Sequence, residues 1–195
     1  IFNIFQKTNF DWKDTKTIII TPQHKDSCGC ANLNKLIQTK YNNDIASVKT
    51  EYKIYKVGDR VVRKENDYTG ECIRVNGDQA HISGINREKR TIKVTYDDGD
   101  VQEIKIKDFE ELFDLFYAST IHKLQGTGKD IGYLFISKKH SMWWNEQSWT
   151  LLYTAISRIK KKLIIIGNPE QFLRAQKKNC YSKPSIFMKE GFDGI

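Results

Sequence analysis

The segment LLYTAISRIKKKLIIIG, residues 151–167, joins a helix-forming stretch to a strand-forming one. Apolar residues at 152, 155, 156 and 159 recur at the spacing of one helix face and predict a helix over 146–159. The run KKLIIIG, 161–167, is short, rich in isoleucine and ended by glycine, which is typical of a buried strand. A helix that leads into such a strand indicates an α/β fold.

The same alternation continues on both sides of this segment. Pro22 ends an isoleucine-rich run, and the sequence Asn168-Pro169 is a typical helix start, with Asn at the cap and Pro at the first helical position. The other predicted elements are strands at 15–22, 114–119 and 131–137 and helices at 30–41 and 168–178.

Residues 54–112 differ from the rest, because they consist of short β-prone runs separated by turn signals such as Asn76-Gly77-Asp78. Four or five short strands in so few residues predict a small, strongly bent β-barrel. We therefore expect a discontinuous α/β domain at 1–53 and 113–180, an inserted barrel at 54–112 and a C-terminal tail at 181–195.

Composition limits the class of protein. The 195 residues carry 32 Lys and Arg against 24 Asp and Glu, a net charge of +8 that favours a nucleic-acid partner. The four cysteines are scattered, and the spacing of Cys28 and Cys30 is not that of a zinc site, so we expect reduced thiols, no metal site and an intracellular location. Neither a membrane-spanning run nor a signal peptide is visible, so no membrane partner is expected.

The stretch HKLQGTGKD, 122–130, contains Gly-Lys but does not fit the phosphate-binding P-loop. The P-loop pattern needs glycine where Lys123 stands and a hydroxyl residue where Asp130 stands. No other segment of the sequence fits the pattern. We therefore expect this chain alone not to hydrolyse ATP.

Two features have both a functional and an ordinary interpretation. Arg158 lies one helical turn after Thr154, and it either clamps a phosphate or is a solvated cation near a helix C-terminus. The segment STIHKLQG, 119–126, stands where a strand meets a helix, and it is either a phosphate-contacting segment or a simple helix cap.

Three segments resemble a known family. YASTIHKLQGTGKD, 117–130, resembles motif V of superfamily 1 helicases of the RecD type, and residues 151–167 resemble their motif VI. IIITPQHKDSCGCANLNKLIQ, 18–38, is similar to the segment that opens their second RecA-like domain. The β-rich insert lies where that family has a Src-homology-3-like barrel. The resemblance implies a RecA-like P-loop-NTPase-type domain, the second motor domain, which has no P-loop of its own and is interrupted by such a barrel.

The resemblance also implies a function, the C-terminal motor half of an ATP-dependent 5′–3′ DNA helicase of replication or repair. ATP and Mg²⁺ would be held mainly by an N-terminal RecA-like domain of the same protein, and the location would be cytoplasmic, nuclear or viral. The DNA partner would be a single strand or a fork. Arg158 would be the arginine finger. Nucleotide-proximal residues would be Gln125, Gly126 and Tyr153, and the DNA track would be lined by Pro22, His24, Lys25, Asn34, Thr120, His122 and Lys123.

Two positions depart from the family. Gly128 stands where an acidic residue is expected, and Ser157 stands where threonine is commoner, a change that keeps the hydroxyl. The alternative to a motor is a non-enzymatic nucleic-acid-binding module that uses the β-barrel, and a third interpretation is a structural α/β protein with a barrel appended. The joint presence of both motifs and the insert favours the motor.

Overall fold

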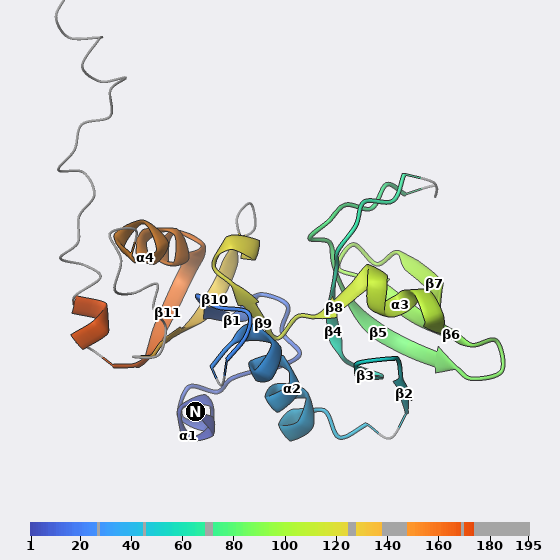
Figure 1. Cartoon of the computed structure of the whole chain (residues 1–195), viewed down its shortest axis with the longest axis horizontal. Coiled ribbons are helices and arrows are strands. Elements are labelled where there is room, and N and C mark those ends of the chain that lie inside the picture. Colours follow the sequence, from blue (N-terminus) through green and yellow to red (C-terminus); the bar gives the residue numbers. More distant parts are fainter. Residues whose placement is uncertain are drawn as a thin grey trace, which may run out of the picture.

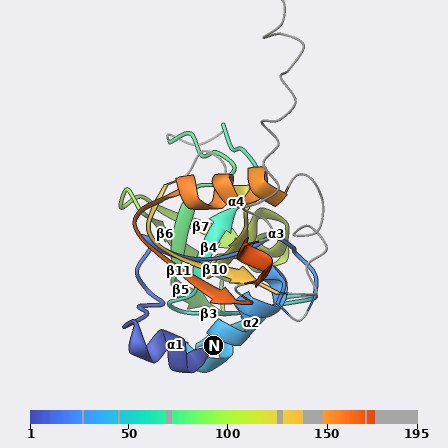
Figure 2. The same cartoon turned by 90° about the vertical axis from the view of Figure 1, so that its left-hand side faces the viewer.

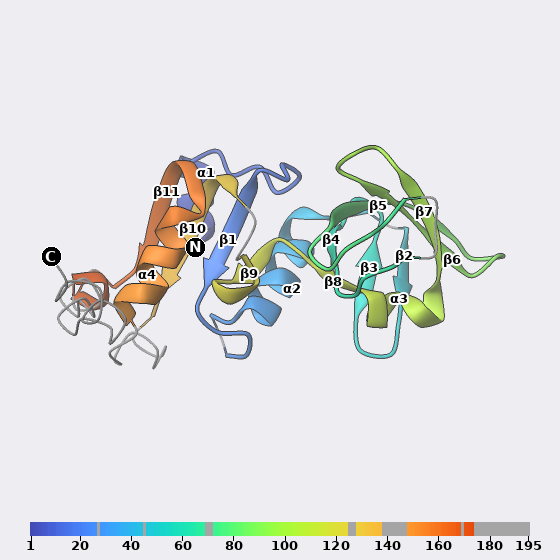
Figure 3. The same cartoon turned by 90° about the horizontal axis from the view of Figure 1, so that it is seen from above.

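The computed structural model describes residues 1–26, 28–44, 46–68, 72–124, 128–137, 148–168 and 170–173. Two parts lie side by side along the long axis of the molecule (Figures 1 and 3). One is a parallel sheet with helices, and the other is built on an antiparallel sheet. The predicted C-terminal tail lies outside the described residues.

The parallel sheet has four strands in the order β11-β10-β1-β9. The inner strand β1 contains Ile18, Ile19 and Ile20, and all three are fully buried. This is expected for an inner strand of a parallel sheet that is covered on both faces. The strands are β1 (Thr17–Thr21), β9 (Ala118–Thr120), β10 (Lys129–Ile136) and β11 (Ile159–Gly167).

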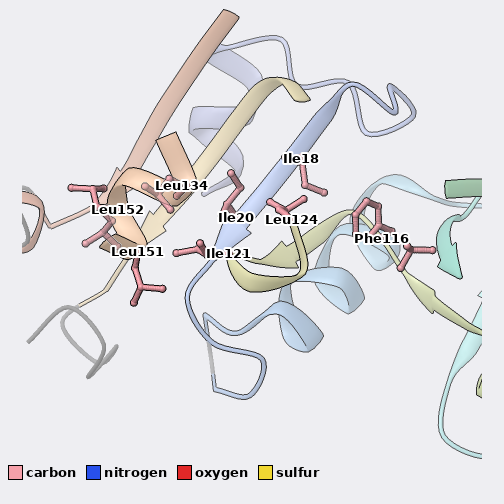
Figure 4. Close-up of a cluster of buried hydrophobic side chains, with 11 residues drawn as sticks. Ile18, Ile20, Phe116, Ile121, Leu124, Leu134, Leu151 and Leu152 are labelled. Atoms are coloured by element: carbon pink, nitrogen blue, oxygen red, sulfur yellow. The ribbon is translucent and has the colours of Figure 1, made fainter. Parts of the chain in front are cut away.

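Helices cover both faces of this sheet, with α4 (Ser148–Ser157) on one side and α1 (Phe2–Lys7) and α2 (Cys30–Tyr41) on the other (Figure 2). On the α4 face, Leu151 and Leu152 pack in one cluster with Ile20 and Leu134 (Figure 4). The opposite face holds a second cluster that includes Leu33 and Ile37 of α2. The prediction of a helix at 30–41 is confirmed, whereas α1 was not predicted.

The predicted helix at 146–159 extends too far. The helix ends at Ser157, because Ile159 already pairs with Lys129 as the first residue of β11. Ile156, which was expected on the buried face, is 39% exposed, and Leu151 takes its place in the core.

The antiparallel part contains a hairpin, a five-stranded sheet in the order β7-β6-β5-β4-β8, and one helix. Its core includes Tyr55, Ile82, Ile92, Phe109 and Phe113. The hairpin is β2 (Ser47–Lys49) and β3 (Ile54–Lys56), the other elements being β4 (Arg60–Arg63), β5 (Gln79–Asn86), β6 (Thr91–Tyr96), β7 (Val101–Lys105), α3 (Ile106–Leu112) and β8 (Phe113–Leu115).

The paired strands of this part run over 47–115, a wider range than the expected 54–112, because β2 pairs with β3 and β8 pairs with β4. The prediction of one strand at 114–119 is wrong for the same reason. β8 belongs to the antiparallel sheet and β9 to the parallel sheet, and Phe116 and Tyr117 form the crossing between them. The alternation of residue types along 114–119 does not reveal which sheet each half joins.

The prediction of a mixed α/β fold with a parallel sheet and a β-rich insert is confirmed. Within the described ranges, the helices are all too short or too polar to cross a membrane. The cysteines that the structure describes, Cys28, Cys30 and Cys72, are free thiols.

Candidate functional site

A groove of about 610 Å³ lies where the two parts of the molecule meet. Its walls come from α2 on one side, from the β2–β3 hairpin on the other, and from the β8–β9 crossing between them. Val62, Leu115, Phe116 and Ala118 contribute apolar lining, and three of these four side chains are buried. The groove therefore has an apolar floor.

The rim of this groove is basic. Five lysines and one aspartate line it, so the charge is positive. The lysines are Lys35 of α2, Lys49, Lys53 and Lys56 of the hairpin, and Lys123 after β9.

Asp114 is the carboxylate in this set, and it pairs with Lys53 at 2.5 Å and with Lys123 at 3.5 Å. Burial opposes ionisation of Asp114, but the two ammonium groups outweigh burial and lower its pKa below the usual value. Asp114 therefore stays charged and pairs with both the Lys53 side chain of the hairpin and the Lys123 side chain that follows β9.

The loop after β1 brings His24 to the groove. Pro22 is buried and ends the strand, whereas His24 and Lys25 are exposed. The loop is folded onto the start of α2, because the backbone N–H of Ala31 donates to the carbonyl of His24 at 3.1 Å. Gly29 is needed here, since a Cβ at that position would lie 2.6 Å from the backbone of Lys25.

The segment after β9 presents His122 and Lys123. Thr120 is buried, and its hydroxyl accepts a hydrogen bond from the Lys123 N–H at 3.4 Å. Leu124 is fully buried and anchors the short 3₁₀ turn His122–Leu124 to the core. The turn thereby leaves His122 and Lys123 exposed.

Asn34 lies at the groove, but its polar atoms are occupied by the chain itself. Its side-chain oxygen accepts from the N–H groups of Tyr117 and Ala118, both at 2.8 Å. Its amide donates to the carbonyl of Ala118 at 3.0 Å. Asn34 therefore fixes the β8–β9 crossing against α2.

Of the residues expected near nucleotide, Tyr153 and Arg158 belong to α4 and to the connection from α4 to β11, the edge strand opposite β9. Arg158 directly follows α4, and its carbonyl accepts from the N–H of Lys129, the first residue of β10. The buried Arg158 Nε has no hydrogen-bond partner among the described residues. Tyr153 is 57% exposed on α4. Gln125 and Gly126 lie outside the described residues.

The departure at Gly128 has a structural counterpart. A Cβ at this position would lie 2.7 Å from the Lys160 Cε, so the lysine stem occupies the space of a side chain there.

Gly128 and Arg158 flank the amino ends of β10 and β11, whereas His24 and Thr120 follow the carboxyl ends of β1 and β9. Arg158 is thus separated from His24 and Thr120 by the length of the strands.

The walls of the groove are fastened by Asp59, which is fully buried at the start of β4. Its carboxylate accepts from the side chains of Gln38 (2.5 Å), Asn42 (2.7 Å) and Tyr117 (2.8 Å) and from the Lys56 N–H (2.7 Å). Burial raises the pKa of Asp59, and these four donors oppose that rise.

The hairpin side of the groove was not predicted from the sequence. Lys49 and Tyr52 precede the expected insert at 54–112 and were assigned to the α/β part. Lys53 was assigned to the α/β part as well, and the near-balanced charge of 54–112 hid Lys56. These lysines become part of a basic surface only when the hairpin faces α2. The missed signal is the lysine spacing over 49–56.

No protein-family model matches this sequence. Two curated relatives do. The chain is 30% identical over 154 residues to the ATP-dependent RecD2 DNA helicase of Deinococcus radiodurans, a match covering 77% of the chain and 20% of that protein. It is 24% identical over 189 residues to the RecBCD enzyme subunit RecD of Buchnera aphidicola subsp. Schizaphis graminum, covering 90% of the chain and 30% of that protein. The chain thus spans less than a third of either relative.

Solved structures share the fold. The crystal structure of Bacteroides Pif1 bound to ssDNA matches with a TM-score of 0.50 and 20% identity, over 76% of this chain and 40% of that one. A structure of Pif1 with forked dsDNA matches with a TM-score of 0.52 and 19% identity, over 78% and 39%. Sequence relatives and fold together confirm that this chain is related to the superfamily 1 DNA helicases of the RecD type.

Proposed function

We propose that this chain is the C-terminal motor half of an ATP-dependent 5′–3′ DNA helicase and that its groove holds single-stranded DNA. The observation that carries the proposal is the combination of five rim lysines with an apolar floor. Proteins that bind single strands combine a cationic track for the backbone with apolar or aromatic surfaces for the bases. The relationship to a RecD2 DNA helicase supports the choice of DNA.

In this proposal the two walls contact the same strand. His24, Lys25, His122 and Lys123 supply exposed contacts from the α/β part, and the hairpin lysines supply them from the insert. Pro22, Asn34 and Thr120 are buried or occupied, so we assign to them the shaping of the track. A single strand or the single-stranded arm of a fork is the partner.

ATP is the proposed cofactor, because the Deinococcus relative is ATP-dependent. When bound, its transferring phosphoryl group develops negative charge that a guanidinium can neutralise. Arg158 fits this role, since its buried Nε lacks a hydrogen-bond partner within the described ranges. A second cation, Lys160, lies next to Gly128. We place Gln125, Gly126 and Tyr153 near the nucleotide as well.

The partner across the nucleotide would be an N-terminal RecA-like domain of the same protein, which would hold Mg²⁺ and most of the phosphates. Exposed apolar side chains of α4, Tyr153 and Ile156, suit such a covering domain. The insert, which we extend to 47–115, is proposed to be a Src-homology-3-like barrel, and the register shift between Ile82 and Gly84 supports strong bending of β5. The free thiols Cys28, Cys30 and Cys72 suit an intracellular protein.

A non-enzymatic nucleic-acid-binding module is the second candidate, favoured by the fact that neither Arg158 nor Tyr153 lines the groove. Both candidates require the groove to bind DNA, and they differ in whether Arg158 matters to ATP hydrolysis.

The groove is tested by a salt titration of oligothymidylate binding to the 195-residue chain. Lys35→Ala and Lys49→Ala, on opposite walls, should each reduce the slope of log K against log salt by about 0.7, the value for one lost single-strand phosphate contact. Lys105→Ala changes an exposed lysine of β7 that does not line the groove and serves as the control. Slopes of both groove variants equal to the control's would overturn the proposal.

A further inference from the structure

Tyr52 stands at the tip of the β2–β3 hairpin and lines the groove. The hairpin turns tightly, because the N–H of Thr50 donates to the carbonyl of Lys53 at 2.9 Å. Although the turn is ordered in this way, the Tyr52 side chain is 80% exposed. A large aromatic ring is thus held at the mouth of a basic groove with most of its surface in water.

The backbone that carries Tyr52 is fixed from one side by α3, beside which the hairpin lies (Figure 3). The Glu110 carboxylate accepts from the Thr50 hydroxyl at 2.5 Å and from the N–H of Tyr52 at 3.1 Å. The next residue, Lys53, is fixed by Asp114. The ring therefore stands on a restrained base, which lowers the ordering entropy that a ligand contact would cost.

The surroundings of the ring specify the kind of ligand. Lys49 and Lys53 flank Tyr52 on the hairpin and suit phosphates, whereas the ring faces suit a flat apolar group. A hydrogen bond with Glu51 raises the pKa of the Tyr52 phenol, so the ring stays uncharged beside phosphates. A nucleotide chain has these two chemistries in every residue, because each phosphate is linked to a base.

We propose that Tyr52 is a stacking platform for an unpaired base of the strand held by the hairpin lysines, a contact that rests on the proposed function of the groove. Every base has a π face, so the contact accepts any sequence and requires only that the base be unpaired. Because Tyr52 lies on the insert, the insert itself would distinguish unpaired from paired DNA.

Tyr68 provides a matched control. It is also an exposed tyrosine of the insert, at 68%, but it does not line the groove, and its hydroxyl accepts from the Asn66 side chain. Replacement of either tyrosine by alanine removes the same atoms from the surface. The two variants differ only in whether the ring stands at the groove.

The test compares two ligands of about 15 nucleotides, a length near the upper site size of a single-strand-binding fold. One is oligothymidylate and the other is a fully abasic strand, which has the phosphates without the bases. Tyr52→Ala should weaken oligothymidylate binding by about fivefold to about a hundredfold, the range of one lost stacking contact. It should leave abasic binding unchanged, Tyr52→Phe should bind as wild type does, and Tyr68→Ala should have no effect.

The outcomes separate the two proposals. Equal weakening of both ligands by Tyr52→Ala, or no weakening of either while Lys49→Ala still lowers the salt slope, overturns the platform and keeps the groove. If wild type and all variants bind neither ligand, both the platform and the groove are overturned. Far-ultraviolet circular dichroism of each variant confirms that the fold is retained, so a loss confined to oligothymidylate reports on the base contact.

Discussion

The hydroxyl of Tyr117 donates a hydrogen bond of 2.8 Å to the carboxylate of Asp59. Asp59 lies where the chain enters the antiparallel sheet, and Tyr117 lies where it returns to the parallel one. The bond therefore links the two passages between the parts of the molecule. Because Gln38 and Asn42 of α2 donate to the same carboxylate, one buried group ties the insert to the helix that forms the opposite wall of the groove.

Asp59→Asn should lower the free energy of unfolding by about 2–3 kcal/mol, because an amide NH₂ group would face donors that the carboxylate satisfies. Tyr117→Phe removes one of these bonds and should cost about 1 kcal/mol. The measurement is urea unfolding of the single and double variants. Since both act on one network, the double variant should cost less than the sum of the singles by about 1 kcal/mol, and strict additivity would argue against a shared network.

Lys129 forms a second tie between the two parts, since its ammonium group donates to the carbonyl of Thr15 and to the side chain of Gln79 in β5. Burial, together with the nearby Arg60, lowers the pKa of Lys129 from 10.5 to about 8. Between these values the unfolded chain binds the proton and the folded chain does not. The contribution of Lys129 to stability therefore rises as the pH increases from about 8 to about 10.5.

The expected size of this rise is up to about 3 kcal/mol. It is measured as the difference in unfolding free energy between wild type and Lys129→Met, at several pH values from about 7 to about 11, a window chosen to bracket both pKa values. The comparison cancels other groups that titrate at high pH. Lys162→Met, an exposed lysine of β11, is the control. If the Lys129→Met curve runs parallel to wild type across the window, Lys129 keeps its ordinary pKa.

Local patterns predicted much of the parallel half. The spacing of Leu33 and Ile37 predicts the helix α2, and the run of isoleucines predicts the buried strand β1. Both predictions succeed because each pattern lies within a few consecutive residues. The crossing at Phe116 and Tyr117 could not be predicted, since it depends on which distant strand each side pairs with.

The candidate site shows the same limit. His122 and Lys123 were identified from a motif that is contiguous in the sequence. Lys35 and Lys49 face one groove only because α2 and the hairpin meet through Asp59, and no local pattern records such a contact. Asn34 was expected to line the DNA track, but whether its amide is free depends on the backbone of Ala118, which is 84 residues away.

Arg158→Ala is expected to lower ATP turnover by about 10³-fold or more, the usual effect of removing an arginine finger, in a protein that contains this chain and a P-loop domain. Oligonucleotide binding should change little, because Arg158 lies at the sheet edge opposite Thr120. Arg158→Lys should not restore turnover, since an ammonium group lacks the planar fork of a guanidinium.

Lys162→Ala, which changes an exposed cation of β11 a few residues away, controls for loss of surface charge. Turnover of Arg158→Ala close to that of the control, in a folded protein, would return Arg158 to the role of a solvated cation at the end of α4. The non-enzymatic module would then be the better description of the chain.

His122 and Lys123 are neighbours on one exposed turn, and they should contribute to DNA binding in different ways. Lys123→Ala should weaken binding for every sequence and reduce the slope of log K against log salt by about 0.7. His122→Ala should lose a stacking contact of about 1–3 kcal/mol with little change in that slope, because a ring that stacks on a base neutralises no phosphate. Both are measured by salt titration of single-stranded oligonucleotide binding without nucleotide.

Lys123 also pairs with Asp114, and the Lys53 partner of that carboxylate remains after the substitution, so the groove should keep its shape in Lys123→Ala. Lys123→Arg keeps the charge and should restore the slope. A lower salt slope in Lys123→Ala but not in His122→Ala distinguishes a phosphate contact at Lys123 from a base contact at His122. Wild-type binding by both at every salt concentration would place this turn off the track and favour its role as a cap after β9, held by Thr120.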